Sequence, residues 1–151
     1  MDDLIHIGAE GLKRLAIRLA RMADRLAYGN KSEAPPPRLV SAKRIAPSKR
    51  FLNGAYAVEM VFENAVAGLR SSGETCGFSF TDENGIAVPI IYKTKITGNT
   101  VRIETMNQEN IKSYNLVYGV GIAPYCSITD GRDMAIPVLP PIAVKDTLPK
   151  Y

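Results

Sequence analysis

The chain has 151 residues, enough to bury a core of its own but with room for only one ordinary domain and an appendage. Its composition, 46% hydrophobic and 23% charged, is that of a globular protein, and no apolar run approaches the ~20 residues of a membrane-spanning helix. Residues 1–50 carry 11 Lys and Arg against 5 Asp and Glu, but these charges form no continuous run, so we expect no nucleic acid and no membrane among its partners.

The N-terminus holds the quartet Asp3-Leu4-Ile5-His6, in which the only histidine of the chain follows a carboxylate by three residues. An imidazole beside a carboxylate is a typical general base, because the acid fixes its tautomer and stabilises its cation. Such a quartet is also common by chance, and Asp3 would be equally favourable near the N-terminus of a following helix. The residues alone leave both interpretations open.

An amphipathic helix is predicted from about residue 10 to residue 28, with apolar side chains on one side and basic ones on the other. The apolar residues are Leu12, Leu15, Leu19, Met22, Ala23 and Leu26, and the basic residues are Lys13, Arg14, Arg18, Arg21 and Arg25. Membrane-surface helices usually carry Trp or Phe on the apolar side, so we expect this side to pack against protein. A second copy of the helix is one such surface, which predicts possible self-association.

The helix is predicted to end at Gly29, and Ala34-Pro35-Pro36-Pro37 then prevents further helix. We therefore divide the chain into residues 1–33, a proline linker at 34–37, and a C-terminal domain at 38–151.

The hydrophobic period changes from helical to two after this linker, as expected for half-buried strands. The clearest case is the inward series Tyr56, Val58, Met60 and Phe62. Asn84-Gly85 and Gly98-Asn99 are hairpin signals, which predict a meander over 75–82, 86–96 and 100–106. Further strands are expected near 38–46, 114–120 and 134–139. Six or more short strands indicate a mainly β protein: an antiparallel β-sandwich or jelly roll preceded by one amphipathic α-helix.

Two cysteines, Cys76 and Cys126, allow one disulfide, and the sequence leaves open whether they are bonded. With a single histidine they cannot supply the usual four ligands of a zinc site, so we expect neither metal nor cofactor. Acidic residues at predicted turns, where Asp stabilises the local backbone, are Asp82, Glu83, Asp130 and Asp133.

Several short motifs occur in order along the chain. They are Asp3-Leu4-Ile5-His6 with a helix running into Tyr28-Gly29, Val61-Phe62-Glu63-Asn64-Ala65 with Gly68-Leu69, Gly77-Phe78-Ser79-Phe80, and Tyr118-Gly119-Val120-Gly121 with Pro124, Asp130-Gly131 and Ile136-Pro137. In order and spacing they resemble the C-terminal part of bacterial sialate O-acetylesterase-like proteins, carbohydrate esterases of the SGNH hydrolase family. By this resemblance, residues 1–33 are the end of the hydrolase domain and residues 38–151 are a C-terminal β-sandwich.

The resemblance implies hydrolysis of O-acetyl esters on sugars by a Ser-His-Asp mechanism, with His6 as the base and Asp3 as the residue that orients it. The family's Gly-Asp-Ser block, which holds the nucleophile, does not occur in this sequence. We therefore expect a fragment that is inactive alone. Its implied partners are the missing N-terminal hydrolase segment and an acetylated carbohydrate, and the parent enzyme is expected to be periplasmic or extracellular.

The competing interpretation is a non-catalytic β-sandwich module that binds carbohydrate or protein. Exposed aromatic side chains gathered on one face would favour sugar binding. The candidates are Tyr56, Tyr92, Tyr114, Tyr118 and Tyr125.

Overall fold

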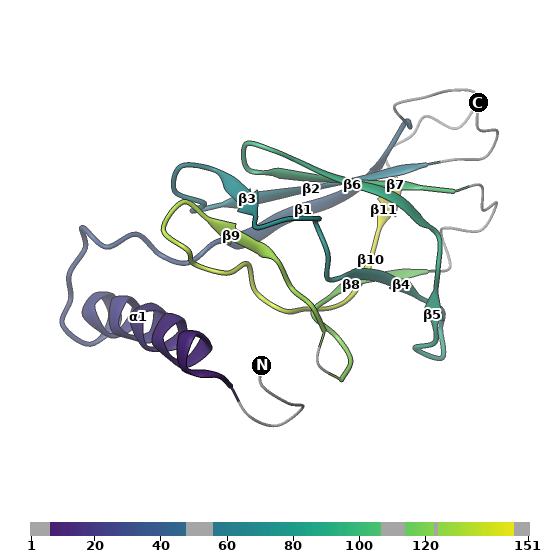
Figure 1. Ribbon diagram of the computed structural model, residues 1–151. Coiled ribbons are helices and arrows are strands. Elements are labelled where there is room, and N and C mark those ends of the chain that lie inside the picture. Colours follow the sequence, from purple (N-terminus) through teal and green to yellow (C-terminus); the bar gives the residue numbers. More distant parts are fainter. Residues whose placement is uncertain (1–6, 48–55, 107–113, 123, 147–151) are drawn as a thin grey trace.

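The computed structural model describes residues 7–47, 56–106, 114–122 and 124–146 (Figure 1). Its elements are α1 (Ala9–Leu26), β1 (Arg38–Ile45), β2 (Ala57–Glu63), β3 (Leu69–Ser71), β4 (Phe78–Thr81), β5 (Ala87–Val88), β6 (Ile91–Thr97), β7 (Thr100–Thr105), β8 (Asn115–Tyr118), β9 (Ile128–Asp130), β10 (Leu139–Ala143) and β11 (Lys145–Asp146). The protein is mainly β with one preceding helix, as the sequence predicts.

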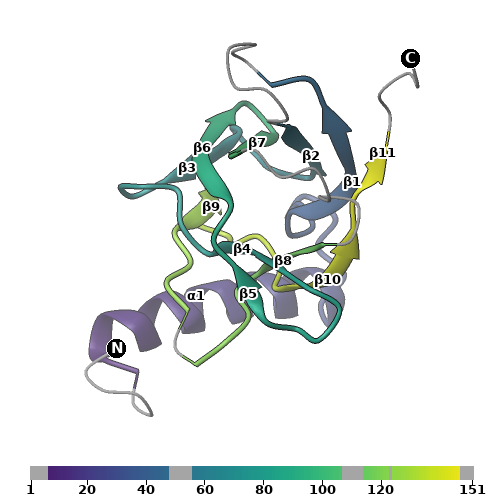
Figure 2. The same cartoon turned by 90° about the vertical axis from the view of Figure 1, so that its right-hand side faces the viewer.

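Most of the described strands belong to two sheets. The larger has the order β11-β1-β2-β7-β6, the smaller has the order β10-β8-β4-β5, and β3 pairs with β9. The neighbours are antiparallel, as predicted, except that β11 runs parallel to β1. In the view of Figure 2, β1, β2, β6 and β7 lie on one side of the molecule and β4, β8 and β10 on the other.

Side chains from both sheets form one hydrophobic core. In β2, Val58, Met60 and Phe62 are buried, which confirms the predicted alternation. Their neighbours in the same cluster come from β7, β4 and β8, and include Val101, Ile103, Phe80, Leu116 and Tyr118. Full burial of such a side chain contributes roughly 1.5–3 kcal/mol, so this cluster is the main source of stability.

Both predicted hairpin turns are present, but the expected three-stranded meander is not. Asp82 Oδ1 accepts a hydrogen bond of 2.9 Å from the backbone N–H of Asn84, inside the turn between β4 and β5. Gly98, with a φ of 56°, lies in the turn between β6 and β7. The predicted strand 86–96 is divided at Pro89, which has no N–H to contribute to a sheet. As a result β5 pairs in the smaller sheet and β6 in the larger one.

The last predicted strand is displaced along the sequence. We expected it at residues 134–139, whereas β10 begins at Leu139 and contains Pro140 and Pro141. Within the described residues β10 is the edge strand of its sheet, where a missing N–H is tolerated. Its register with β8 shifts between Leu139 and Ile142, at these two prolines.

Candidate functional site

The predicted catalytic residues, Asp3 and His6, lie outside the described residues, and the structure describes the segment that follows them. Helix α1 begins three residues after His6. Ile7 packs over its first turn, where a Cβ added at Gly11 would lie only 2.5 Å from Ile7 Cγ2. The lack of a side chain at Gly11 therefore allows Ile7, the residue that follows His6 in the sequence, to pack closely against the helix.

Helix α1 has an apolar side that remains open. We call the residues of this side the leucine stripe: Leu12, Leu15, Leu19 and Leu26, with exposed fractions of 54%, 41%, 59% and 73%. No residue of the helix is buried. We expected this side to pack against protein; in the described structure its four leucines are exposed and Met22 is partly buried. The described residues also contain no helix long and apolar enough to cross a bilayer.

The basic side of α1 makes polar contacts that the sequence analysis did not predict. We call Arg14, Arg18, Arg21 and Arg25 the arginine face, and three of these side chains bond to the turn that follows β9. Arg14 donates to both carboxylate oxygens of Asp133, at 2.8 and 2.5 Å.

The neighbouring arginines bond mainly to backbone oxygens. Arg18 donates to the carbonyl of Asp133 at 2.6 Å, and Arg21 donates to the carbonyl of Arg132. Because guanidinium groups carry five donors and no acceptor, a turn that presents a carboxylate and free carbonyls is a matched surface for this face. Figure 1 shows α1 beside the β9 end of the β domain.

The turn that receives the arginine face is itself firmly held. Asp130 is completely buried, and its carboxylate accepts hydrogen bonds from the backbone N–H groups of Arg132 and Met134, at 2.8 and 2.9 Å. The Arg132 guanidinium bonds to the same carboxylate at 3.0 Å and reaches Glu33 Oε1 at 2.6 Å and the Ala34 carbonyl at 2.9 Å. Arg132 therefore ties the linker to the β domain.

Asp133 has an unusual backbone conformation and a shifted acidity. Its φ of 65° lies in the left-handed region, which Asp and Asn adopt more readily than other non-glycine residues. Hydrogen bonding from Arg14 lowers the pKa of its carboxyl group, and the same contact raises the pKa of Arg14. The sequence indicated only that Asp133 lies in a turn. Its role in holding α1 could not be predicted, because its partners on the helix are more than 100 residues away in the chain.

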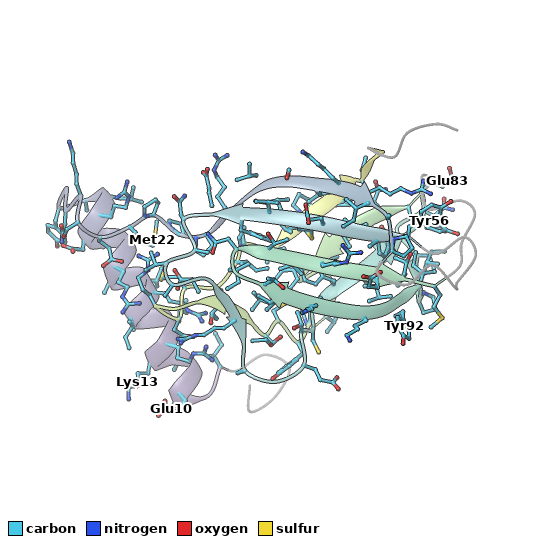
Figure 3. All side chains as sticks on the ribbon, turned by 90° about the horizontal axis from the view of Figure 1, so that it is seen from above. Glu10, Lys13, Met22, Tyr56, Glu83 and Tyr92 are labelled. Atoms are coloured by element: carbon cyan, nitrogen blue, oxygen red, sulfur yellow. The ribbon has the colours of Figure 1, made fainter. Side chains whose placement is uncertain are left out.

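The five candidate tyrosines do not gather on one face. Tyr118 is buried, Tyr114 packs against the core, and Tyr56 lies under the guanidinium of Arg44, 3.1 Å from ring centroid to Cζ. The two with more than half of their surface exposed are Tyr92, at 59%, and Tyr125, at 67%. Figure 3 shows Tyr92 at the end of the molecule away from α1. Tyr92 is one of the residues that line a groove formed by residues 73–75 and 91–94.

The two cysteines are free thiols in the structure. Burial raises the pKa of Cys126 and also that of Tyr118, whose hydroxyl accepts a hydrogen bond of 3.3 Å from the backbone N–H of Ile128. The Cys126 sulfur lies close to the backbone of Gly77, where an added Cβ would be 3.2 Å away. Among the described residues no group of His, Cys, Asp and Glu is placed to hold a metal ion.

Comparison with known proteins gives a likeness of fold. No family model matches the sequence, and no curated protein matches it. A solved structure, that of a carbohydrate acetylesterase from Xanthomonas citri, is similar with a TM-score of 0.59 and 17% sequence identity. The match covers 83% of this chain and 27% of that chain. Residues 38–151 are only about three quarters of this chain, so the shared fold also includes part of residues 1–37.

Proposed function

We propose that the chain is the C-terminal part of a carbohydrate esterase of the sialate O-acetylesterase-like SGNH type, with residues 38–151 as its β-sandwich domain. The observation that carries the proposal is the likeness in fold to about a quarter of a carbohydrate acetylesterase. That likeness extends into residues 1–37, the region that holds the Asp-x-x-His motif and the helix. The order and spacing of the motifs in the sequence support the same kind of enzyme.

The proposed reaction is hydrolysis of an O-acetyl ester on a sugar. His6 takes the proton of a serine hydroxyl as the serine oxygen attacks the acetyl carbonyl, and it then protonates the departing sugar oxygen, which leaves an acetyl-serine ester. A water molecule that gives a proton to His6 then attacks this ester, and acetate leaves as His6 returns the proton to the serine oxygen. Asp3 holds the imidazole in the required tautomer and stabilises its cation. The serine and the donors that stabilise the oxyanion belong to a hydrolase segment outside this sequence, because no serine of this chain lies in a Gly-Asp-Ser motif.

The leucine stripe is a suitable contact surface for that segment. Burial of one leucine contributes roughly 1.5–3 kcal/mol, and the stripe presents four that are at least 41% exposed. The arginine face fixes α1 to the β domain on another side of the helix and leaves the stripe open. This is the arrangement expected of a helix that lies between two domains and follows directly after a catalytic histidine.

Acetate release tests the proposal. The coding sequence upstream of Met1 is expected to hold a Gly-Asp-Ser segment, and the protein that joins this segment to the chain should release acetate from acetylated sugars. His6→Ala should lower this activity by about 10³-fold or more, whereas the matched surface change Lys13→Ala should leave it unchanged. Equal activity of the joined protein with and without His6 would contradict the mechanism.

The chain by itself should hydrolyse an aryl acetate at a rate close to background. Slow hydrolysis that persists in His6→Ala is compatible with this expectation. Hydrolysis by the chain alone that disappears in His6→Ala would show that the fragment interpretation is wrong.

A second candidate function is a non-catalytic module whose β domain binds carbohydrate. The observation that favours it is the groove that Tyr92 lines. Tyr92 lies at the end of the molecule away from α1 (Figure 3). The two functions are separable, because the first requires acetate release and the second requires only binding.

A further inference from the structure

The groove beside Tyr92 has the size of a small-molecule site. Its volume is about 480 Å³, within the range of roughly 300–1,000 Å³ that is usual for ligand sites. One wall is the loop of residues 73–75 between β3 and β4, and the other is the start of β6 at residues 91–94. Two segments that are distant in the sequence therefore meet to form it.

A β-bulge interrupts the edge strand β6 at Tyr92, one of the residues that line this groove. Ile91 pairs with Thr105 and Lys93 pairs with Glu104, so Tyr92 is an extra residue with no partner of its own on β7. Bulges bend a strand and redirect a side chain, and they are frequent beside binding sites. The result is a tyrosine ring that is 59% exposed on an otherwise regular strand.

The opposite wall is held in place by two serines. Ser127 Oγ donates to the Glu74 carbonyl at 2.9 Å and accepts from the Cys76 N–H at 3.1 Å. Ser71 Oγ lies 3.0 Å from the same carbonyl and 2.8 Å from Ser127 Oγ. These bonds fix the backbone of Glu74 while its side chain stays exposed to the groove. The wall is therefore formed before any ligand binds, which lowers the cost of ordering it.

The functional groups in the groove match the chemistry of a neutral sugar. Glu74 and Lys93 are exposed, and no hydrogen bond or ion pair joins their charged groups to another described residue. A carboxylate accepts hydrogen bonds from hydroxyl groups, an ammonium donates to them, and Thr94 can do either. The two charges cancel, which disfavours phosphates and nucleic acids. The tyrosine ring offers an apolar face with a polar tip.

We infer that this groove is a carbohydrate-binding subsite, in which one pyranose ring of a neutral glycan stacks on Tyr92 while its hydroxyl groups bond to Glu74 and Lys93. The choice of a glycan rests on the proposed function. Tyr92 lies at the end of the molecule away from α1 (Figure 3), so the groove binds a sugar unit of the glycan other than the acetylated one, which is left to the hydrolase segment.

Isothermal titration calorimetry of the chain with xylohexaose, cellohexaose and chitohexaose tests the inference. At least one of the three should bind with a saturable heat. Tyr92→Ala should weaken that binding at least ten-fold and Glu74→Gln about three-fold, whereas Tyr92→Phe, which keeps the ring, should change it by less than about three-fold. The matched control is Tyr28→Ala, since Tyr28 is 82% exposed on the chain after α1 and should have no effect.

Unchanged melting temperatures will show that the variants are folded, which is expected because both side chains are exposed. Absence of saturable binding to all three glycans, or equal effects of Tyr92→Ala and Tyr28→Ala, would overturn the inference. Binding does not require acetate release. If the chain binds a glycan but forms no active esterase with its upstream segment, the esterase proposal alone is wrong. If the joined protein is an active esterase but the chain binds none of the glycans, the subsite alone is wrong.

Discussion

The attachment of α1 to the β domain through Asp133 can be tested with one isosteric change. Asp133→Asn removes the charge that faces Arg14 and Arg18 and keeps a residue type that accepts a φ of 65°. The Arg14 side chain is 53% exposed, so its pair with Asp133 is screened by water, and such pairs contribute roughly 0.2–1 kcal/mol each. The bonds of Arg18 and Arg21 to backbone carbonyls remain. We therefore expect Asp133→Asn to weaken the docking of α1 on the β domain by about 1 kcal/mol. This change lowers the ratio of docked to undocked molecules about five-fold.

Hydrogen exchange of the α1 amides measures this change. An isolated helix of 18 residues is marginal in water, so undocking should expose these amides, and their exchange should become about five-fold faster in Asp133→Asn. Glu83→Gln is the control, because it removes an equal charge at the end of the molecule away from α1. Exchange that is unchanged in Asp133→Asn, or equally changed in both variants, would refute the proposed role of this carboxylate.

Acidification should have the same effect as the substitution. The pKa of Asp133 is lower in the docked state than its ordinary value of about 3.9, so the contribution of its carboxylate to docking is fully present above that value. The contribution is lost as the pH falls through the lowered pKa. The exchange rate of the α1 amides should therefore rise below about pH 4, relative to that of the core strands and after correction for the intrinsic effect of pH. This rise should occur in the unchanged chain and not in Asp133→Asn.

Three further outcomes are expected. A chain that lacks residues 1–33 should retain a cooperative thermal transition by circular dichroism, because the core lies in the strands after the linker; loss of cooperativity would place the domain boundary elsewhere. Analytical ultracentrifugation should show concentration-dependent association that weakens when Leu15 and Leu19 become Asp, and a strict monomer at high concentration would contradict this. Phe80→Ala should lower the free energy of unfolding by about 3–5 kcal/mol in a denaturant titration, and a loss below 1 kcal/mol would argue against its place in the core.

The parts of the fold that depend on local pattern could be predicted from the sequence. The alternation in β2, the turns at Asn84-Gly85 and Gly98-Asn99 and the position of α1 are each set by residues next to one another in the chain. The strands β3 and β9 have three residues each, too few to show a period, and were not predicted. The predicted strand 86–96 is divided at Pro89 because β5 joins one sheet and β6 joins the other. No local sequence pattern indicates which sheet a strand will join.

The candidate sites were predicted less completely, for a physical reason. The charges of the arginine face are visible in the sequence, but the carbonyl oxygens that bind Arg18 and Arg21 are present in every residue, and only the folded turn directs them to α1. The direction of Tyr92 depends in the same way on a register shift between β6 and β7. The assignments of Asp3 and His6 stay predictions, since both residues lie outside the described part of the chain.

Two of the outer strands, β6 and β10, limit the ways in which copies of this protein can aggregate. Each presents an open edge in the described sheets, and an open edge can template pairing with another chain. Exposed Lys93 and Lys95 on β6 add repulsion between copies, and Pro140 and Pro141 remove two N–H groups from β10. Growth of a continuous intermolecular sheet is thereby disfavoured at these two edges. The outer strands at the opposite edges, β11 and β5, have two residues each and offer little backbone for pairing. The apolar side of α1 is the surface through which we expect copies to associate, and a contact between helices does not extend a sheet.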